Sequence, residues 1–165
     1  MAQVFSVFDS EGWGGLIANL GLVWMALAVS SLGPMLTGTS TSAGLRDAPW
    51  TPPGWFIVAV WVCLYTLLGV SLWLLNRVSD PPRGSLKPLV FVLLFVLATW
   101  TFYAFSATSR LPGLLGNIAI FFIVVFVVWR IWPYSRPSAL TIAPVGIWIT
   151  IATATILDAA RLYGW

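Results

Sequence analysis

The sequence predicts an all-α integral membrane protein whose single domain, residues 1–165, forms a bundle of five transmembrane helices. Of the 165 residues, 59% are hydrophobic and 8% are charged, and the mean hydropathy is +0.94. Water-soluble domains carry roughly 25% charged residues, so a soluble globule is excluded. The chain is therefore predicted to be a multi-pass protein, and we expect it in a bacterial membrane.

Charged and Pro/Gly-rich breaks divide the apolar residues into five runs. A spanning helix needs about 20 apolar residues, and each run has about that length. Membrane strands alternate apolar and polar residues, whereas residues 89–97 and 118–128 are unbroken apolar runs, so strands are the weaker interpretation. The spans are predicted at about 13–36, 54–76, 86–107, 111–132 and 138–162.

The first span opens on Trp13, an aromatic residue suited to the headgroup interface. Residues 1–12 contain Asp9 and Glu11 but no Lys or Arg, so they lack the basic region of a signal peptide, and we expect a permanent helix. The connection after it, residues 37–53, is the longest. Two interpretations of it are open: a lid over the mouth of the bundle, or a flexible surface connector.

The second span follows a proline-rich segment. Pro52 and Pro53 push the residue before each of them out of the helical region, so a helix is expected to begin here with a proline in its first turn. Trp61 and Tyr65 are four residues apart and share a helical face, which Gly69 continues with room for a neighbouring helix or a flat ligand. Cys63, the single cysteine, is expected to be a small buried hydrophobe.

The last three spans differ in polarity. The segment 78–85 predicts a turn, and the third span is apolar until it reaches Trp100 near its far end. Gly116 and Asn117 give the fourth span a small, hydrogen-bonding surface, which interhelical packing explains as well as a ligand contact does. The fifth span is the most polar and is expected inside the bundle; its Asp158 is expected to pair with Arg161.

The charges exclude several function classes. The net charge of +3 is spread over the loops without a cluster, so nucleic-acid binding is not supported. Histidine is absent and no carboxylates are paired, so neither a metal site nor an enzyme is predicted. The basic residues predict that the N-terminus lies inside, because five of them (Arg77, Arg83, Lys87, Arg130, Arg136) fall on that side and three (Arg46, Arg110, Arg161) on the other.

Aromatic residues from several spans point to a function. Flat side chains that converge from separate helices suit a flat apolar ligand, because stacking and edge contacts favour planar guests. Trp61 and Trp148 lie well inside their spans and are expected to face such a cavity. Trp13, Trp129, Trp132 and Trp165 lie at predicted interfaces and are expected to be anchors.

The pattern Trp-x-Pro-Pro-x-Trp at residues 50–55, followed by Trp61-x-x-Leu64-Tyr65, resembles the TspO/translocator protein family, also called tryptophan-rich sensory proteins or peripheral benzodiazepine receptors. Pro144, Trp148 and Ala152 resemble its last-helix pattern, and Trp100 its third-helix tryptophan. The resemblance spans roughly residues 45–162 and agrees with a bundle of five spans.

The resemblance implies a ligand cavity beneath the first loop. Family members bind porphyrins and other tetrapyrroles, sterols and isoquinoline-type ligands; many are dimers, and some are reported to promote light-dependent tetrapyrrole breakdown. By resemblance, no cofactor is required, and a bound tetrapyrrole, carotenoid or lipid is expected. The partners expected are membrane lipid, a hydrophobic small molecule and either a second copy or other membrane subunits. The residues expected around the cavity are Trp50, Pro52, Pro53, Trp55, Trp61, Tyr65, Trp100, Trp148 and Ala152.

Three departures leave the function open. Aliphatic side chains replace polar family residues at Leu97, Val145 and Ile156. Two hypotheses follow. The chain binds a flat hydrophobic ligand for sensing, sequestration or transport, or it is an accessory subunit of a larger membrane complex whose former cavity is filled.

Overall fold

The computed structural model describes residues 8–37, 47–79, 82–104 and 109–164, and within these ranges the chain forms five helices. Each is long and apolar enough to cross a membrane. The lid proposed for the first connection depends on residues 38–46, which lie outside the described ranges, as does Trp165. The helices are α2 (Trp13–Thr37), α3 (Gly54–Leu75), α4 (Pro82–Ala104), α5 (Leu111–Ile131) and α6 (Arg136–Tyr163).

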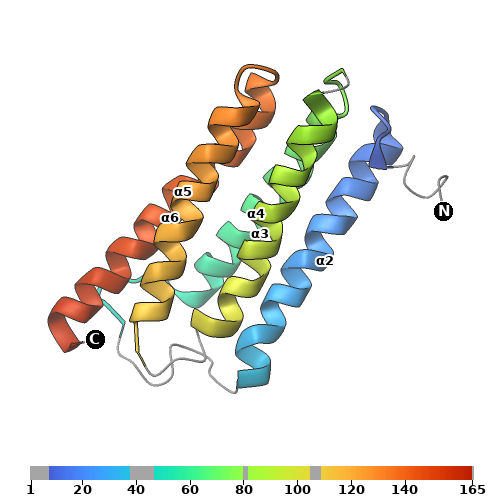
Figure 1. The fold of residues 1–165 in the computed structure, drawn as a ribbon. Helices are drawn as coiled ribbons and strands as arrows, with labels where there is room; N and C mark the ends of the chain where they lie inside the picture. Colours follow the sequence, from blue (N-terminus) through green and yellow to red (C-terminus); the bar gives the residue numbers. More distant parts are fainter. Residues whose placement is uncertain (1–7, 38–46, 80–81, 105–108, 165) are drawn as a thin grey trace.

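The helices run side by side along one direction, with α2 at one edge of the bundle and α5 and α6 at the other (Figure 1). Their contacts close a ring: α2 packs against α3 and α4, α4 against α5, α5 against α6, and α6 against α3. A further contact joins α3 and α4 across the ring.

Proline sets the starts of two helices differently from the prediction. Pro53 has φ −62° and ψ 149°, an extended conformation, so it caps α3 from outside and the first helical residue is Gly54. Helix α4 begins at Pro82, inside the segment predicted to be a turn. Proline fits a first helical position because its missing N–H has no partner there in any helix.

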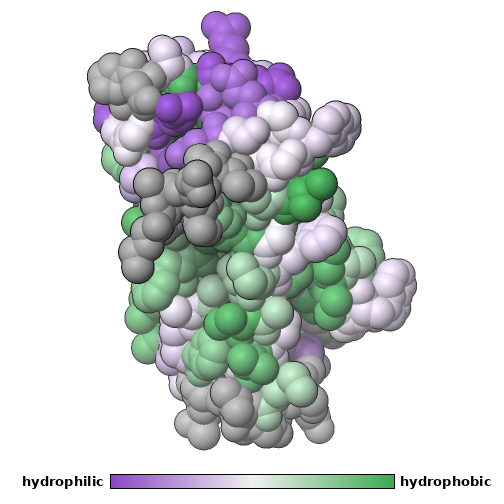
Figure 2. Space-filling view, turned by 90° about the vertical axis from the view of Figure 1, so that its right-hand side faces the viewer, coloured by the Kyte–Doolittle hydropathy of each residue, from purple (hydrophilic) through white to green (hydrophobic). Residues whose placement is uncertain are grey.

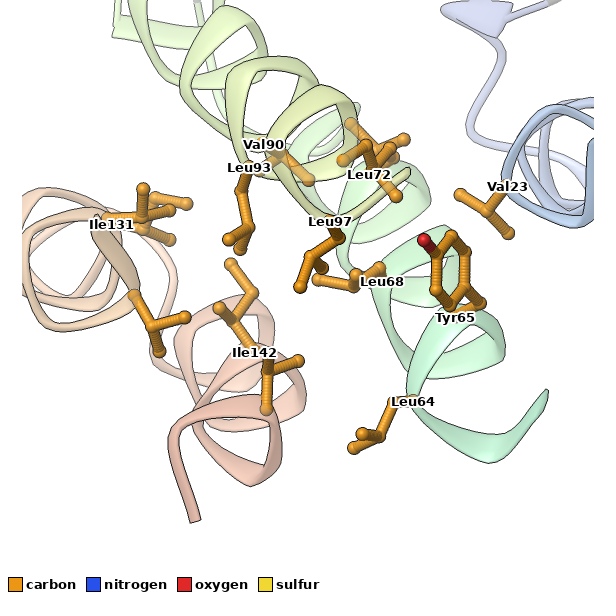
Figure 3. Packing of buried hydrophobic residues seen from close by; sticks show 14 of the residues in the cluster. Val23, Leu64, Tyr65, Leu68, Leu72, Val90, Leu93, Leu97, Ile131 and Ile142 are labelled. Carbon is orange, nitrogen blue, oxygen red and sulfur yellow. The ribbon is translucent and has the colours of Figure 1, made fainter. Parts of the chain in front are cut away.

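The core is built from aliphatic side chains of α3, α4, α5 and α6 (Figure 3). Tyr65 belongs to this core, since its side chain lies between α3 and Val23 of α2 (Figure 3) and is 1% exposed. Gly69 lets α2 approach: a Cβ there would lie 3.0 Å from side-chain atoms of Leu20 and Val23. The room predicted at Gly69 is therefore filled by a neighbouring helix.

Two polar networks tie the elements together. Ser71 of α3 and Ser138 of α6 are fully buried, with their hydroxyl oxygens 2.7 Å apart. At the end where α2 begins, the Asn76 amide donates to the carbonyls of Phe8 and Ser10, and Lys87 pairs with Asp9. Figure 2 shows hydrophilic residues gathered at this end and mostly apolar residues over the rest of that face, as a membrane-crossing bundle requires.

One expectation about side-chain position is wrong. Cys63 is exposed on α3, on the side opposite Trp61 and Tyr65, and is not buried. Helix α6 supplies Ile142, Val145 and Ile149 to the core, while its threonines bond to their own helix: Thr153, for example, donates to the carbonyl of Ile149. A hydroxyl satisfied in this way can face lipid at little cost.

Candidate functional site

A cavity of about 760 Å³ lies at the end of the bundle where α3 and α5 begin and α2, α4 and α6 end, the lower end in Figure 1. All five of the helices named above contribute to its wall, together with residues of the two loops at this end. The lining is mainly aliphatic and aromatic. Small-molecule pockets measure roughly 300–1,000 Å³ and have such linings, so the cavity fits a ligand of that class.

Tryptophans from four helices line the cavity: Trp24 of α2, Trp61 of α3, Trp100 of α4 and Trp148 of α6. Neighbouring rings hold two of them in place. Trp61 packs against Tyr65 with ring centroids 6.1 Å apart, and Trp148 packs against Phe56 at 6.4 Å. These contacts limit the rotation of the indoles and present them as fixed surfaces to the space between the helices.

Trp24 is a lining residue that the sequence interpretation missed. Its indole N–H donates to Thr66 Oγ1 at 3.1 Å, which fixes α2 against α3 at the cavity wall. A signal was available, since Trp24 lies in the middle of its span, as Trp61 and Trp148 do in theirs. A tryptophan at that depth is too far from the headgroups to act as an interfacial anchor.

The predicted site residues divide into two groups. Pro52, Trp61, Trp100, Trp148 and Ala152 line the same cavity, although they come from one loop and three helices. The others are outside the lining: Trp55 is 73% exposed, Tyr65 is in the core, and Trp50 and Pro53 belong to the first loop without lining the cavity. Ligand contact by any of these residues stays a prediction.

Trp50 makes a contact that the sequence did not predict. Its indole N–H donates to Asp158 Oδ2 at 2.9 Å and so joins the first loop to α6. In the part of the chain described, Asp158 forms no ion pair with Arg161, and the expectation of a local pair is wrong.

The wall of the cavity depends on a close approach between α4 and α5. A Cβ on Gly116 would lie 2.5 Å from Tyr103 Oη and 2.7 Å from Trp100 Cδ1, so no larger residue fits without a shift. The absence of a side chain at Gly116 therefore positions the Trp100 indole. The small surface predicted on the fourth span is real, and α4 is the helix that packs against it.

Polar residues make up about a third of the lining, and two of them, Arg110 and Asn117, are almost fully buried. At the open end, Arg110 is 8% exposed and donates through its guanidinium to the carbonyl of Gly164. Deeper, Asn117 is 0% exposed, and neither polar atom of its side chain has a hydrogen-bond partner among the described residues. The expectation that Asn117 bonds to another helix is thus wrong.

The three aliphatic departures from the family pattern are not equivalent. Leu97 and Ile156 line the cavity, and they make its wall less polar. Val145 is fully buried in the core and does not line it. The cavity is not filled by these side chains, so the reasoning that they close a former site loses its support. Within the described ranges no three His, Cys, Asp or Glu side chains gather to hold a metal ion.

Comparison with known proteins agrees with this architecture. The sequence model of the TspO/MBR family matches residues 21–161. The chain is 28% identical to the tryptophan-rich protein TspO of Archaeoglobus fulgidus and 29% identical to translocator protein 2 of Mus musculus, in each case over 78% of this chain and 85% of the relative. It is 26% identical to protein CrtK of Rhodobacter capsulatus over 72% of this chain and 75% of the relative. The chain is a multi-pass integral membrane protein that belongs to the TspO/MBR family.

Proposed function

We propose that this TspO-like protein binds a flat hydrophobic ligand, a tetrapyrrole, sterol or pigment, in the cavity described above and uses it for sensing, sequestration or transport. The observation that carries the proposal is the convergence of Trp61, Trp100 and Trp148 from three helices on one cavity of about 760 Å³. Each indole offers a flat, polarisable face. Such faces favour planar guests over flexible chains of equal area.

The position of the cavity supports a ligand that arrives from the membrane or its surface. Its wall is formed by helices whose outer faces carry exposed apolar side chains, and Pro52 and Thr51 of the first loop cover one part of it. The Trp50–Asp158 hydrogen bond fixes that loop segment. Burial there would remove most of an apolar ligand from water or lipid, and the polar groups of the wall would then set the orientation of the ligand.

Titration with protoporphyrin tests the proposal. We expect saturable binding, followed by the absorbance of the porphyrin, in the purified protein in detergent. Trp61→Phe and Trp148→Phe should each weaken it several-fold, because the phenyl ring offers a smaller flat face than the indole and aromatic contacts are worth about 0.5–1.5 kcal/mol beyond their buried area. Trp129→Phe is the matched control, since Trp129 is 66% exposed and outside this cavity. Equal weakening in all three variants, or no saturation in the parent, would reject the proposal.

Association with other membrane subunits is the second candidate function. The exposed apolar faces of α2 and α5 would support it, but they are equally suited to lipid. Purification in a mild detergent distinguishes the ligand-binding function from the accessory role. Stoichiometric partner subunits together with no porphyrin binding would favour an accessory role, whereas a protein that binds porphyrin alone or as a homodimer favours the ligand-binding function. Illumination of the bound complex then reports whether the ligand is broken down.

A further inference from the structure

The carboxamide of Asn117 is a buried polar group that the protein itself leaves without a partner. The side chain is 0% exposed and lines the cavity, and its oxygen and nitrogen both lack a hydrogen-bond partner among the residues described. Most buried polar side chains in proteins are satisfied, because an unpaired one loses its hydration without compensation. A second cavity-lining atom, Thr51 Oγ1, is likewise buried and has no partner within the described residues.

Helix packing does not explain Asn117. Its neighbour Gly116 brings α5 against the side chains of Trp100 and Tyr103, and Gly113 lies beside Ile156. Apolar or aromatic surfaces therefore make the contacts of this turn, and the amide takes no part in them. An aliphatic residue of the same size would serve the packing equally well and would avoid the cost of an unpaired amide.

We propose that Asn117 determines ligand specificity by pairing with a donor and an acceptor that the ligand presents side by side, as a lactam or carboxamide does. This inference rests on the proposed function, because it concerns the same cavity. A carboxamide offers N–H donors and a carbonyl acceptor, and a lactam meets one of each with two parallel hydrogen bonds. A hydrocarbon meets neither. A site with buried polar groups binds a ligand that leaves them unpaired more weakly. Among flat ligands of equal apolar area, pairing with the Asn117 carboxamide therefore decides the order of affinity.

Three flat probes of nearly equal size test the pairing. Phenanthridin-6(5H)-one is a tricyclic lactam; its N-methyl derivative keeps the carbonyl but loses the donor; phenanthrene has neither group. Affinities for the parent protein and Asn117→Leu are measured by the fluorescence of the probes. The parent should prefer the lactam over both analogues by about tenfold, and Asn117→Leu should bind all three with equal affinity. Leu115→Ala is the matched control on α5, because Leu115 is exposed and outside the cavity.

Thermal unfolding of the same proteins separates recognition from structure. Asn117→Leu without ligand should unfold at the same temperature as the parent or higher, since the substitution removes an unpaired buried amide. A lower unfolding temperature, together with weaker binding of all three probes, would assign Asn117 a structural role and overturn the inference. Equal affinity of the parent for the three probes would also overturn it while leaving the proposed function intact. Binding of none of them, phenanthrene included, would contradict the proposed function itself.

Discussion

Replacing Gly116 by alanine is the change whose effect the structure defines best. A Cβ added there would lie 2.5 Å from Tyr103 Oη, 2.7 Å from Trp100 Cδ1 and 2.9 Å from Trp100 Nε1. Cβ atoms in real structures do not come closer than 3.0 Å to such neighbours. Either α4 and α5 must separate or the Trp100 indole must move, and both changes alter the wall of the cavity.

Gly113 provides the control, one turn earlier on the same helix. A Cβ there would lie 3.6 Å from Ile156 Cδ1 and 3.7 Å from the Ala104 Cβ, which are ordinary contacts. Both substitutions gain the helix propensity of alanine over glycine, about 1 kcal/mol. The difference between the two variants therefore isolates the clash, which overpacking data put at about 1–3 kcal/mol.

The assay is thermal unfolding in detergent combined with the porphyrin titration. Gly113→Ala should be as stable as the parent or slightly more stable; it is the control for stability only, because Gly113 itself lines the cavity and its added methyl group can touch the ligand. Gly116→Ala should unfold several degrees below Gly113→Ala and bind porphyrin several-fold more weakly, because a displaced Trp100 intrudes on the ligand. If Gly116→Ala matches Gly113→Ala in stability and the parent in porphyrin affinity, the close approach at Gly116 has no role in the cavity and the reasoning is refuted.

Three further predictions concern other contacts. Trp50→Phe removes the hydrogen bond to Asp158 and should speed ligand dissociation several-fold in a stopped-flow chase. Trp55→Phe, a change at a residue that is 73% exposed, should leave the dissociation rate unchanged. Equal dissociation rates in the two variants would count against a role for the hydrogen bond. Ser71→Ala removes the buried contact with Ser138 and should lower the free energy of unfolding by about 0.6–1.7 kcal/mol. Ser31→Ala should lower it less, because the Ser31 hydroxyl bonds only to the Leu27 carbonyl of its own helix. A smaller loss for Ser71→Ala than for Ser31→Ala would show that the serine pair does not stabilise the packing of α3 on α6. Thr51→Val removes a buried hydroxyl without a partner in the described ranges, so the stability of the unliganded protein should not fall, and a clear drop in unfolding temperature would contradict the assignment.

The helices could be predicted from the sequence because hydropathy dictates them. A bilayer requires long apolar segments with internally satisfied backbones, and that requirement is visible in composition alone. The ends of the helices were harder to predict. The run Pro81-Pro82 predicts a turn, but Pro82 equally suits a first helical position, and only packing decides between the two. The orientation in the membrane stays a prediction from the basic residues.

The candidate site was predictable where depth in a span decides it. Trp61 and Trp148 lie mid-span and line the cavity, and the same reasoning applied to Trp24 would have found it. Cys63 could also have been placed, because it is two residues from both Trp61 and Tyr65 and so lies on the opposite side of the helix. Their shared face does not make Trp61 and Tyr65 equivalent, because Tyr65 is one turn further from the cavity and meets α2.

The remaining site features depend on contacts between distant parts of the chain. Trp50 and Trp55 belong to one motif, yet Trp50 finds its partner at Asp158, 108 residues away, while Trp55 stays at the surface. Nothing in the spacing of the motif distinguishes them. The unpaired amide of Asn117 could not be predicted either. The sequence shows that an asparagine can form hydrogen bonds, but it does not show whether a neighbouring helix supplies the partner.

Protection of a thiol inside the cavity tests the central claim most directly. Ala152→Cys places a reactive group on the wall beside Trp148, and the natural Cys63 on the outer face of α3 serves as the internal reference. Alkylation at both positions is followed by peptide mass spectrometry with and without protoporphyrin. Binding between the helices predicts that protoporphyrin slows alkylation at position 152 and leaves Cys63 unaffected. Equal rates at position 152 with and without a saturating ligand would place the ligand elsewhere and contradict the account.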